Sequence, residues 1–406
     1  MVYLVYRVCL VDSEPGKLNG SERPDRPNMI RIVHVISDLD VGGAEVMLAK
    51  LVVGMDKRGF ANTVVSLTDG GQLGEAITAA GIPVHSLGMK RSRPDLSGLP
   101  KLIRLLKATK PNLVQSWLYH ADFLSLLAAP FAGSPPLLWN VRCSDMDFRH
   151  YPSLTRWTVR ALALGSRWPV AVVSNSVAGQ RLHQRLGYRP RRWEVIPNGI
   201  DLSRFQPDAS ARGRFCAELG LAAETAVVGL VARVDPMKDH AMFLDAARRV
   251  ADVRSGVHFV LIGKGTEMLT PMVAAHKLAG QVHLLGLRND VERLLPGLDV
   301  ACLSSAFGEG FPTVLAESMA CGIPCVTTDV GDARSIVADS GLVVPVRDPA
   351  SLAHAIIDLI DRGPAAREQL GRAARVRIET EYSLSRIVDQ YTALYSDLSF
   401  NDSSAR

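Results

Sequence analysis

The sequence has few of the features that mark specialised classes of protein. Among its 406 residues there are 6 cysteines, and the closest two, Cys321 and Cys325, do not form a C-x-x-C pair. Most of the cysteines lie in apolar runs, which predicts reduced core residues and argues against a disulfide framework or a zinc site. The G-x-G-x-x-G pattern is absent from the sequence, which excludes a nicotinamide dehydrogenase of the usual type.

Long apolar runs are also missing. None reaches the ~18 residues that a membrane-spanning helix needs. The first eleven residues, MVYLVYRVCLV, contain Arg7 and lack both a basic start and a small-residue cleavage site, which argues against a secretory signal. Residues 12–28 are polar and rich in Pro and Gly. We therefore expect residues 1–28 to be a disordered leader before a true start at Met29, in a cytoplasmic protein.

Charge of one sign does not dominate. Lys and Arg number 46 and Asp and Glu 41, and the resulting net charge of +5 is too small for a protein that coats nucleic acid. Hydrophobic residues make up 47% and charged residues 21%, as in ordinary globular proteins. At one domain per ~150 residues, the chain has room for two or three domains.

From Met29 onward, short β-branched runs alternate with amphipathic segments, which is typical of βαβ units and parallel sheets. Seven candidate strands, from IRIVHVI to WEVIP, precede a Pro/Gly/Asn-rich stretch at 197–207, and six more follow it. We predict an α/β protein with two doubly wound, Rossmann-like domains. Their predicted bounds are 29–200 and 201–382, and residues 383–406 are expected to form a last helix, packed back on the first domain, and a tail.

Open α/β sheets bind ligands beyond the carboxyl ends of their strands. The strand at 30–36 leads to Gly42 and Gly43 at the start of a helix, where the backbone can approach an anion such as a diphosphate. A Gly-Gly pair before a helix is more often only a tight turn, so this motif is weak when taken alone.

A second candidate follows the strand at 226–232. Arg233 comes directly after this strand, and Lys238 precedes a helix for which Asp239 is the expected N-cap. Two cations at the carboxyl end of a parallel strand can neutralise a diphosphate. The alternative is a surface arginine paired with Asp235 or Asp239.

The most specific stretch is AFGEGFPTVLAESMACGIPCVT. Glu309 lies in the loop after the strand at 299–304, and Glu317 lies about one turn into a helix that starts near Thr313 or Val314. The first carboxylate can face a ligand from the loop, and the second can take the paired hydroxyls of a ribose. Helix-start N–H groups between them favour a phosphate.

Two D-x-D pairs, Asp38/Asp40 and Asp145/Asp147, match a pattern that some sugar-nucleotide enzymes use to hold a divalent metal. Such pairs also arise by chance in loops. We predict neither a metal nor another cofactor.

Taken in order, GGAE, VSNS, VIPNGID, ARVDPMKDH, VLIGKG and EGFPTVLAESMACGIPCV resemble the group 1 (family 4 type) retaining glycosyltransferases. The resemblance covers nearly all of 29–395. It implies the GT-B fold, in which two Rossmann-like domains face each other across a cleft. It also implies a nucleotide-diphosphate sugar as donor and, usually, no metal.

The resemblance also implies roles for individual residues. Arg233 and Lys238 would hold the diphosphate, Glu309 the donor sugar and Glu317 the ribose, and His120 would lie near the sugar. Gly42 and Gly43 would approach the diphosphate from the other domain, and the segment around Arg288 would border the base. Backbone amides in the EGFPTV segment would complete the donor site; its residues are Gly310, Phe311, Pro312, Thr313 and Val314.

The acceptor side is indicated by charge. Residues 141–192 hold ten arginines and two acidic residues, interleaved with tryptophans. This composition suits contact with an anionic membrane or a lipid-diphosphate acceptor, although some arginines belong to ordinary solvated helix faces. Arg142, at the end of a strand, either binds an acceptor phosphate or pairs with Asp145. No nucleic-acid partner is expected.

The predicted function is transfer of a sugar to a saccharide or lipid-linked saccharide in polysaccharide or cell-envelope glycan synthesis. Two alternatives stay open. A sugar-nucleotide epimerase shares the fold, and a non-catalytic sugar-nucleotide-binding protein would share the donor site.

Overall fold

A computed structural model describes residues 29–57, 59–90, 96–144 and 153–401, so the predicted leader and the pair Asp145/Asp147 lie outside the described residues. The chain divides into two compact units. Unit 1 takes in 1–142, 146–197 and 385–406, and unit 2 takes in 143–145 and 198–384. The main boundary therefore lies at Pro197, three residues before the predicted end of the first domain.

Unit 1 is built on a seven-stranded sheet in the order β3-β2-β1-β4-β5-β6-β7, and every strand pair is parallel. All residues of β4 and β5 are buried, as expected for strands covered on both faces. The strands are β1 (Ile30–Ile36), β2 (Phe60–Ser66), β3 (Val84–Ser86), β4 (Leu113–Trp117), β5 (Leu137–Val141), β6 (Ala171–Ser174) and β7 (Trp193–Val195).

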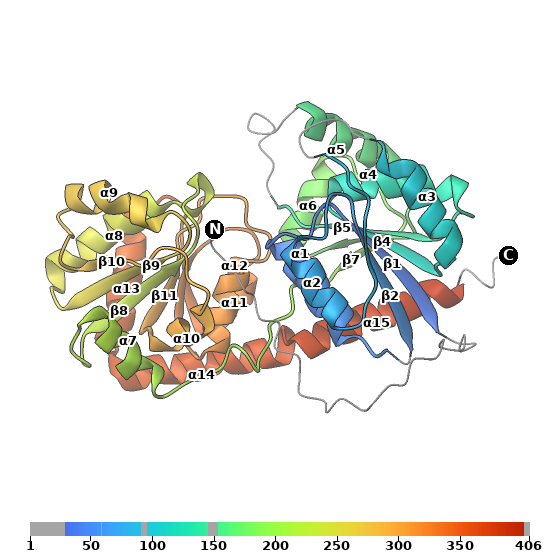
Figure 1. The fold of residues 1–406 in the computed structure, drawn as a ribbon. Coiled ribbons are helices and arrows are strands. Elements are labelled where there is room, and N and C mark those ends of the chain that lie inside the picture. Colours follow the sequence, from blue (N-terminus) through green and yellow to red (C-terminus); the bar gives the residue numbers. More distant parts are fainter. Residues whose placement is uncertain (1–28, 58, 91–95, 145–152, 402–406) are drawn as a thin grey trace. The chain divides into compact units, whose positions relative to one another are not determined.

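The helices of unit 1 connect these strands (Figure 1). Val33, Val35 and Val114 pack with α3 and α4 side chains in one apolar cluster. The helices are α1 (Gly43–Gly54), α2 (Gly71–Ala79), α3 (Gly98–Thr109), α4 (Tyr119–Ala128), α5 (Ser153–Gly165) and α6 (Val177–Arg185), with the C-terminal α15 (Leu384–Asn401).

Helix α15 belongs to unit 1 although it follows the whole of unit 2. Tyr391 and Tyr395 of α15 are fully buried, and their hydroxyl groups reach polar residues inside the sheet. The amide of Asn140 donates to the Tyr391 hydroxyl over 2.8 Å, and the Tyr395 hydroxyl donates to Gln115. Helix α15 thus supplies a hydrogen-bond partner to the Asn140 amide and to the side-chain carbonyl of Gln115, both in the middle of buried strands.

Unit 2 contains a six-stranded sheet in the order β10-β9-β8-β11-β12-β13, again parallel throughout. Neighbouring residues of β8 face opposite sides. Val227 packs with α11 and α14, and Val228 packs with α8 and α13, as the two-residue period of a strand requires. The strands are β8 (Ala226–Val231), β9 (Val257–Ile262), β10 (Val282–Leu284), β11 (Val300–Leu303), β12 (Cys325–Thr328) and β13 (Gly341–Val344).

Two helices of unit 2, α8 and α13, begin at an aspartate that caps them through its side chain. The predicted N-cap Asp239 is confirmed, because its carboxylate accepts a hydrogen bond of 3.1 Å from the backbone N–H of Met242. The helices are α7 (Ala211–Leu219), α8 (His240–Val253), α9 (Thr270–Ala275), α10 (Val291–Leu294), α11 (Thr313–Ala320), α12 (Ala333–Val337), α13 (Pro349–Asp361) and α14 (Gly363–Glu381), with a 3-10 turn at Pro236–Lys238.

The strand orders confirm the predicted pair of Rossmann-like domains. In each sheet the order reverses at one point, between β1 and β4 in unit 1 and between β8 and β11 in unit 2. Ligands of doubly wound sheets bind beyond the carboxyl ends of the strands at this switch point. The loops after these four strands are therefore where functional side chains are expected.

Two further sequence predictions concern membranes and cysteines. Among the described residues, no helix combines the length and apolar character needed to cross a membrane. The five described cysteines are free, and four of them are buried, namely Cys216, Cys302, Cys321 and Cys325. Burial raises the pKa of the Cys325 thiol well above its ordinary value, which is typical of an unreactive core cysteine.

Candidate active site

At the switch point of unit 2, Lys238 and Glu309 form an ion pair. Lys238 ends the 3-10 turn after β8, and Glu309 lies in the loop after β11. Their side chains are only 14% and 9% exposed, so the pair is largely shielded from water. Two residues that are 71 positions apart in sequence thus meet because β8 and β11 are neighbours.

The carboxylate of Glu309 is held on one side only. Its Oε1 atom contacts the ammonium of Lys238 and accepts a hydrogen bond of 2.7 Å from the Ser305 hydroxyl. Within the described part of the chain, Oε2 has no hydrogen-bond partner. This oxygen can therefore accept a hydrogen bond from a ligand hydroxyl.

The backbone around Glu309 is closely fitted. Gly331 has a φ of +57°, and a Cβ atom there would lie 2.1 Å from the carbonyl oxygen of Glu309, so only glycine is accommodated. The Ser304 hydroxyl donates to the carbonyl of Lys238 over 2.7 Å. These contacts fix the β8 and β11 loops to each other and position the ion pair.

Arg233 is the exposed cation of this site. Its side chain is 61% exposed and contacts Asp235 at 3.0 Å, so the pairing considered as an alternative is formed. Burial opposes ionisation of Asp235, but hydrogen bonds from the Met237 N–H and from Arg233 hold the pKa of its carboxyl below the ordinary value. An exposed guanidinium with one carboxylate partner retains donors for an anion.

Helix α11 begins at Thr313, as the sequence predicts. Pro312 is extended before it, and the N–H of Leu315 donates back to the Pro312 carbonyl over 3.1 Å. The N–H groups of Thr313 and Val314 are the remaining donors of the helix start. The Thr313 hydroxyl accepts a hydrogen bond of 2.9 Å from Asn198, and Phe311 is buried against Tyr382. Glu317 is half-buried within this helix.

Arg288 differs from the other predicted donor residues. Its guanidinium makes a two-point contact with Asp290, with both bonds at 2.8 Å, and a further bond of 2.5 Å to Glu218. The hydrogen bonds that Arg288 donates to Asp290 raise the pKa of Arg288 despite partial burial. This side chain joins the β10–α10 connection to α7, and a contact between its segment and a base stays a prediction.

In unit 1, the connection from β4 to α4 is strained. Leu118 has a φ of 71° and a ψ of 157°, a combination that is costly for any residue except glycine. His120 follows two residues later and is exposed, and the pKa of its imidazole is lowered by partial desolvation. The turn therefore presents a neutral imidazole at the carboxyl edge of β4.

Buried hydrogen bonds hold this strained turn. The Tyr119 hydroxyl lies 2.8 Å from Nε2 of His183, and Nδ1 of the same ring lies 2.7 Å from the carbonyl oxygen of Gly179. Since a carbonyl can only accept, Nδ1 carries the proton and Nε2 accepts from Tyr119. A second hydrogen bond joins β4 to the first turn of α4, where the Ser116 hydroxyl donates to Asp122 over 2.5 Å.

The two glycines before α1 differ in their surroundings. A Cβ atom on Gly42 would lie 2.2 Å from a carboxylate oxygen of Glu45, but one on Gly43 would meet nothing within 4 Å. Glu45 is 8% exposed, and burial raises the pKa of its carboxyl. Gly42 thus makes room for Glu45, while unit 1 itself gives no steric reason for Gly43.

Arg142 lies at the end of β5 and packs into unit 1. Its guanidinium lies 5.3 Å from the centre of the Trp117 ring and donates to Asn140 over 3.3 Å. Burial lowers its pKa, and the charge of Glu45 and the hydroxyl of Tyr391 oppose that shift. These neighbours account for the residue structurally; the alternative partner Asp145 lies outside the described residues.

Sequence reasoning missed several residues that shape these sites. Ser305 could have been predicted from the sequence, because it is a polar residue directly after a strand at the switch point. No sequence pattern indicates the roles of Tyr119, His183 and Tyr391, since their partners lie far away in sequence. Among the described residues, no three His, Cys, Asp or Glu side chains group closely enough to hold a metal ion.

Comparison with known families identifies both halves of the chain. The model described as "Glycosyltransferase Family 4" matches residues 41–204, and the one described as "Glycosyl transferases group 1" matches residues 225–362. The first match falls almost wholly on unit 1 and the second on unit 2, and together they take in well over half of the chain.

Individual relatives agree with this assignment. A D-inositol 3-phosphate glycosyltransferase of Geodermatophilus obscurus is 34% identical over 262 residues, which span 58% of this chain and 55% of that enzyme. The Escherichia coli UDP-Gal:alpha-D-GlcNAc-diphosphoundecaprenol alpha-1,3-galactosyltransferase is 25% identical over 76% of this chain and 81% of its own length.

The fold has close solved counterparts. The Anabaena protein HepE, crystallised with UDP, superposes with a TM-score of 0.80 at 22% identity, over 91% of this chain and all of its own. A sucrose-phosphate synthase of Thermosynechococcus elongatus superposes with a TM-score of 0.74 at 19% identity, over 91% of this chain and 99% of its own. Together with the two family matches, this shows that the chain belongs to the group 1 glycosyltransferases and has their GT-B fold.

Proposed function

We propose that the chain transfers a sugar from a nucleotide-diphosphate sugar to a saccharide or a lipid-linked saccharide, with retention of the anomeric configuration. The observation that carries the proposal is the arrangement at the switch point of unit 2. There Glu309 keeps one oxygen for a ligand, next to Lys238, and Arg233 is exposed after the neighbouring strand. Positive charge suits a diphosphate, and a neighbouring carboxylate oxygen that can accept hydrogen bonds from hydroxyl groups suits the sugar joined to it.

The proposed chemistry follows from where charge develops. Breaking the anomeric C–O bond leaves negative charge on the diphosphate, which Arg233, Lys238 and the N–H groups at the start of α11 would stabilise. Glu309 would accept hydrogen bonds from the sugar hydroxyls through Oε2, and Glu317 would bind the ribose. His120, as a neutral imidazole, would contribute a hydrogen bond to the sugar rather than a charge.

Relatives support the class of donor. HepE was crystallised with UDP and with UDP-glucose, and the Escherichia coli relative is named as using UDP-Gal. A Corynebacterium glutamicum relative is named as dependent on GDP-mannose. We therefore propose a nucleoside diphosphate sugar as donor and leave the base and the sugar to experiment.

The acceptor is proposed to be lipid-linked, in synthesis of a polysaccharide or cell-envelope glycan at the inner face of the membrane. The Escherichia coli relative is named for a diphosphoundecaprenol acceptor. The arginine- and tryptophan-rich region 142–193 would contact the anionic membrane. We propose in addition that transfer needs no metal, since protein cations and backbone amides supply the positive charge.

A panel of sugar nucleotides, incubated with the protein and a membrane extract, tests this proposal. We expect one donor to yield a glycosylated lipid product whose new linkage has the donor's anomeric configuration by NMR. Excess EDTA should leave the rate unchanged. An epimerised sugar nucleotide, or binding of a donor without turnover, would contradict the proposal.

A further inference from the structure

Strand β11 has a largely buried carboxylate beyond each end, and the protein uses the two differently. Asp299 comes directly before the strand, and its side chain is 16% exposed. Both of its oxygens are occupied, because Oδ1 accepts from Arg367 over 3.0 Å and Oδ2 accepts from the Val227 N–H over 2.8 Å. Glu309 lies beyond the other end, and its side chain is 9% exposed. Only Oε1 of Glu309 has a partner among the described residues.

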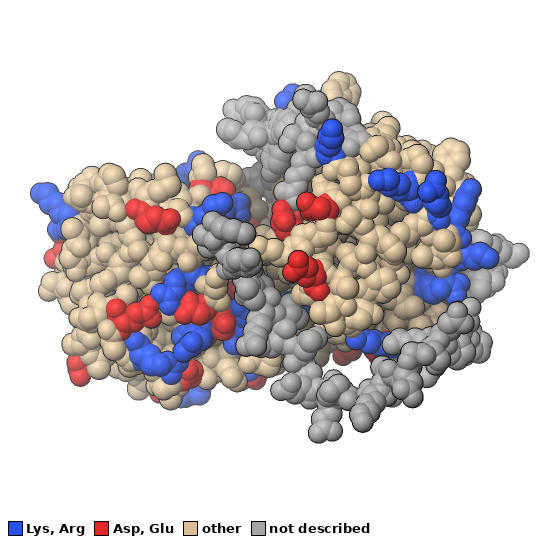
Figure 2. Space-filling view, viewed as in Figure 1, with Lys and Arg blue, Asp and Glu red and all other residues tan. Residues whose placement is uncertain are grey.

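A surface ion pair of unit 2 also engages both oxygens of a carboxylate. Figure 2 shows basic and acidic side chains intermixed over the face of unit 2 that it draws. Within such a pair, Arg254 donates to the two oxygens of Asp361 over 2.9 and 2.7 Å, as the planar fork of a guanidinium allows. A lysine ammonium is a point donor. Lys238 contacts one oxygen of Glu309, and this is the same oxygen that Ser305 contacts.

Ser305 is enclosed by the protein and held by two strands. It is 0% exposed, and its hydroxyl donates to Oε1 of Glu309 over 2.7 Å. Its carbonyl oxygen accepts a hydrogen bond of 2.6 Å from the Thr328 hydroxyl at the end of β12. The preceding residue, Ser304, supports the other partner, because its hydroxyl donates to the carbonyl of Lys238 over 2.7 Å. Buried hydroxyl groups at the carboxyl edge of the sheet therefore position both groups that contact Oε1.

The second oxygen of Glu309 remains for a ligand. Oε2 has no partner among the described residues, and it is not one of their fully enclosed polar atoms that lack a partner, so it reaches open space. A carboxylate oxygen has two lone pairs. Oε2 can therefore accept from two hydroxyl groups, such as those on neighbouring carbons of a sugar ring. Ser305 cannot touch such a ligand, because it is enclosed.

We infer that Ser305 is a positioning residue for the donor sugar. Its hydroxyl and the ammonium of Lys238 hold Oε1, so that Glu309 presents Oε2 alone to two hydroxyl groups of the sugar. The last torsion of a glutamate side chain has only a broad preference of its own, so a second contact on Oε1 is what fixes the plane of the carboxylate. The inference rests on the proposed function, since it assigns Ser305 to the sugar half of the donor.

Binding of the donor with and without its sugar tests the inference. Calorimetry with the full chain first identifies which of UDP, GDP, ADP and dTDP binds, and then which sugar nucleotide with that base binds most tightly. Ser305→Ala should weaken binding of this sugar nucleotide about tenfold, because hydrogen bonds from the sugar to a charged acceptor are loosened. Binding of the nucleoside diphosphate should not change, whereas Lys238→Ala should weaken both. A residue that only supports the fold would move the two affinities together.

Two further serine variants keep the test decisive if Ser305→Ala is unstable. Ser305→Cys keeps the size of the side chain, and its thiol is a weak donor, so it should show the same selective loss at a smaller cost in melting temperature. Ser340, at the amino end of β13, is 5% exposed, and its hydroxyl donates to the Val337 carbonyl over 2.6 Å. Ser340→Ala removes a similarly buried hydroxyl at the opposite edge of the sheet and should leave both affinities unchanged.

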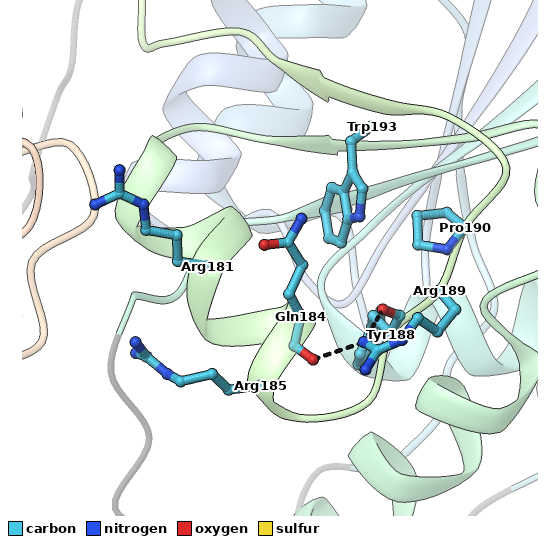
Figure 3. A pocket seen from close by; sticks show the side chains of 7 residues that line it. All are labelled: Arg181, Gln184, Arg185, Tyr188, Arg189, Pro190 and Trp193. Carbon is cyan, nitrogen blue, oxygen red and sulfur yellow. Dashed lines mark hydrogen bonds between the residues drawn. The ribbon is translucent and has the colours of Figure 1, made fainter.

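A basic pocket of unit 1 provides the control for adventitious nucleotide binding. It is lined by residues of α6 and β7, among them Arg181, Arg185 and Trp193 (Figure 3). A hollow lined by positive charge attracts anions without any role in transfer. If the donor binds in unit 2, Arg181→Gln with Arg185→Gln should leave both affinities unchanged in the absence of membranes.

The inference fails on any of three results. Ser305→Ala could leave the affinity for the sugar nucleotide unchanged, or it could weaken the sugar nucleotide and the diphosphate by the same factor. The arginine variant could lose nucleotide binding, which would place the nucleotide on unit 1. Transfer from the bound donor would still support the proposed function in the first two cases. If no nucleotide binds, the proposed function and the inference fail together.

Discussion

The hydroxyl of Tyr119 donates a hydrogen bond of 2.8 Å to Nε2 of His183, so α6 supports the residue directly before His120. His183 is fully buried and neutral, since desolvation lowers its pKa to about 4. The strained connection at Leu118 is thereby held in place by a partner that lies 64 residues away.

Removing the Tyr119 hydroxyl should destabilise the fold. Tyr119→Phe leaves the buried Nε2 atom without a partner, and we expect the free energy of unfolding to fall by about 1–3 kcal/mol. Urea denaturation checks this. Tyr391→Phe at another buried hydroxyl is a reference of the same chemistry, and an unchanged midpoint for Tyr119→Phe would show that Nε2 finds another donor.

Stability should depend on pH through two buried histidines. Burial lowers the pKa of both His34 and His183 from 6.5 to about 4. Between pH 6.5 and 4 the unfolded chain binds protons at these histidines that the folded chain does not bind. The stability of the folded chain is therefore complete above pH 6.5 and falls as the pH falls towards 4. The full loss is on the order of 3 kcal/mol for each histidine. Unfolding at pH 7, 6, 5 and 4.5 measures it, and His183→Asn should flatten the slope.

Variants of the ion pair between Lys238 and Glu309 should affect activity and stability differently. Lys238→Ala should lower transfer about a hundredfold, because a phosphate contact of ~3 kcal/mol is lost. It should also destabilise unit 2, since a largely buried carboxylate is left unpaired. The double variant Lys238→Met, Glu309→Gln removes both charges and should recover the melting temperature but not turnover. Recovery of turnover would place the diphosphate elsewhere.

Replacing Arg233 should weaken binding of the donor and should not change the stability of the fold. Its side chain is 61% exposed, and exposed ion pairs contribute little to stability. Arg233→Ala should weaken donor binding and lower transfer by one to two orders of magnitude at an unchanged melting temperature. The matched control is Arg334→Ala, because Arg334 is 64% exposed and paired with Asp329 in the same unit. Equal effects of the two changes would contradict a donor role for Arg233.

The two glycines of the GGAE motif should respond differently to alanine. Gly42→Ala places a methyl group against the buried carboxylate of Glu45, which must move. We expect a loss of roughly 1–3 kcal/mol in stability. Gly43→Ala has free space within unit 1 and should leave the melting temperature unchanged. If it nevertheless lowers turnover, the space beside Gly43 is used by the donor.

Much of the fold could be predicted from sequence periodicity. Parallel strands buried on both faces need uninterrupted β-branched runs, and IRIVHVI at 30–36 is one that the structure reproduces residue for residue. Capping is local too, so Asp239 and the start of α11 at Thr313 followed from their own neighbours. The positions of Gly42, Lys238 and Glu309 after strands were visible for the same reason.

Tertiary structure alone decided which of these residues meet. The partners Lys238 and Glu309 are joined by the adjacency of β8 and β11. Tyr119 and His183 are joined by the contact between the start of α4 and a residue of α6. Burial also set the protonation of His183 and the enclosure of Ser305, because desolvation and solvent contact depend on what the rest of the chain covers. The sequence by itself determined the two Rossmann-like units and the loops in which functional side chains are expected, since strand periodicity and caps are local properties. Long-range pairing and burial are properties of the folded whole.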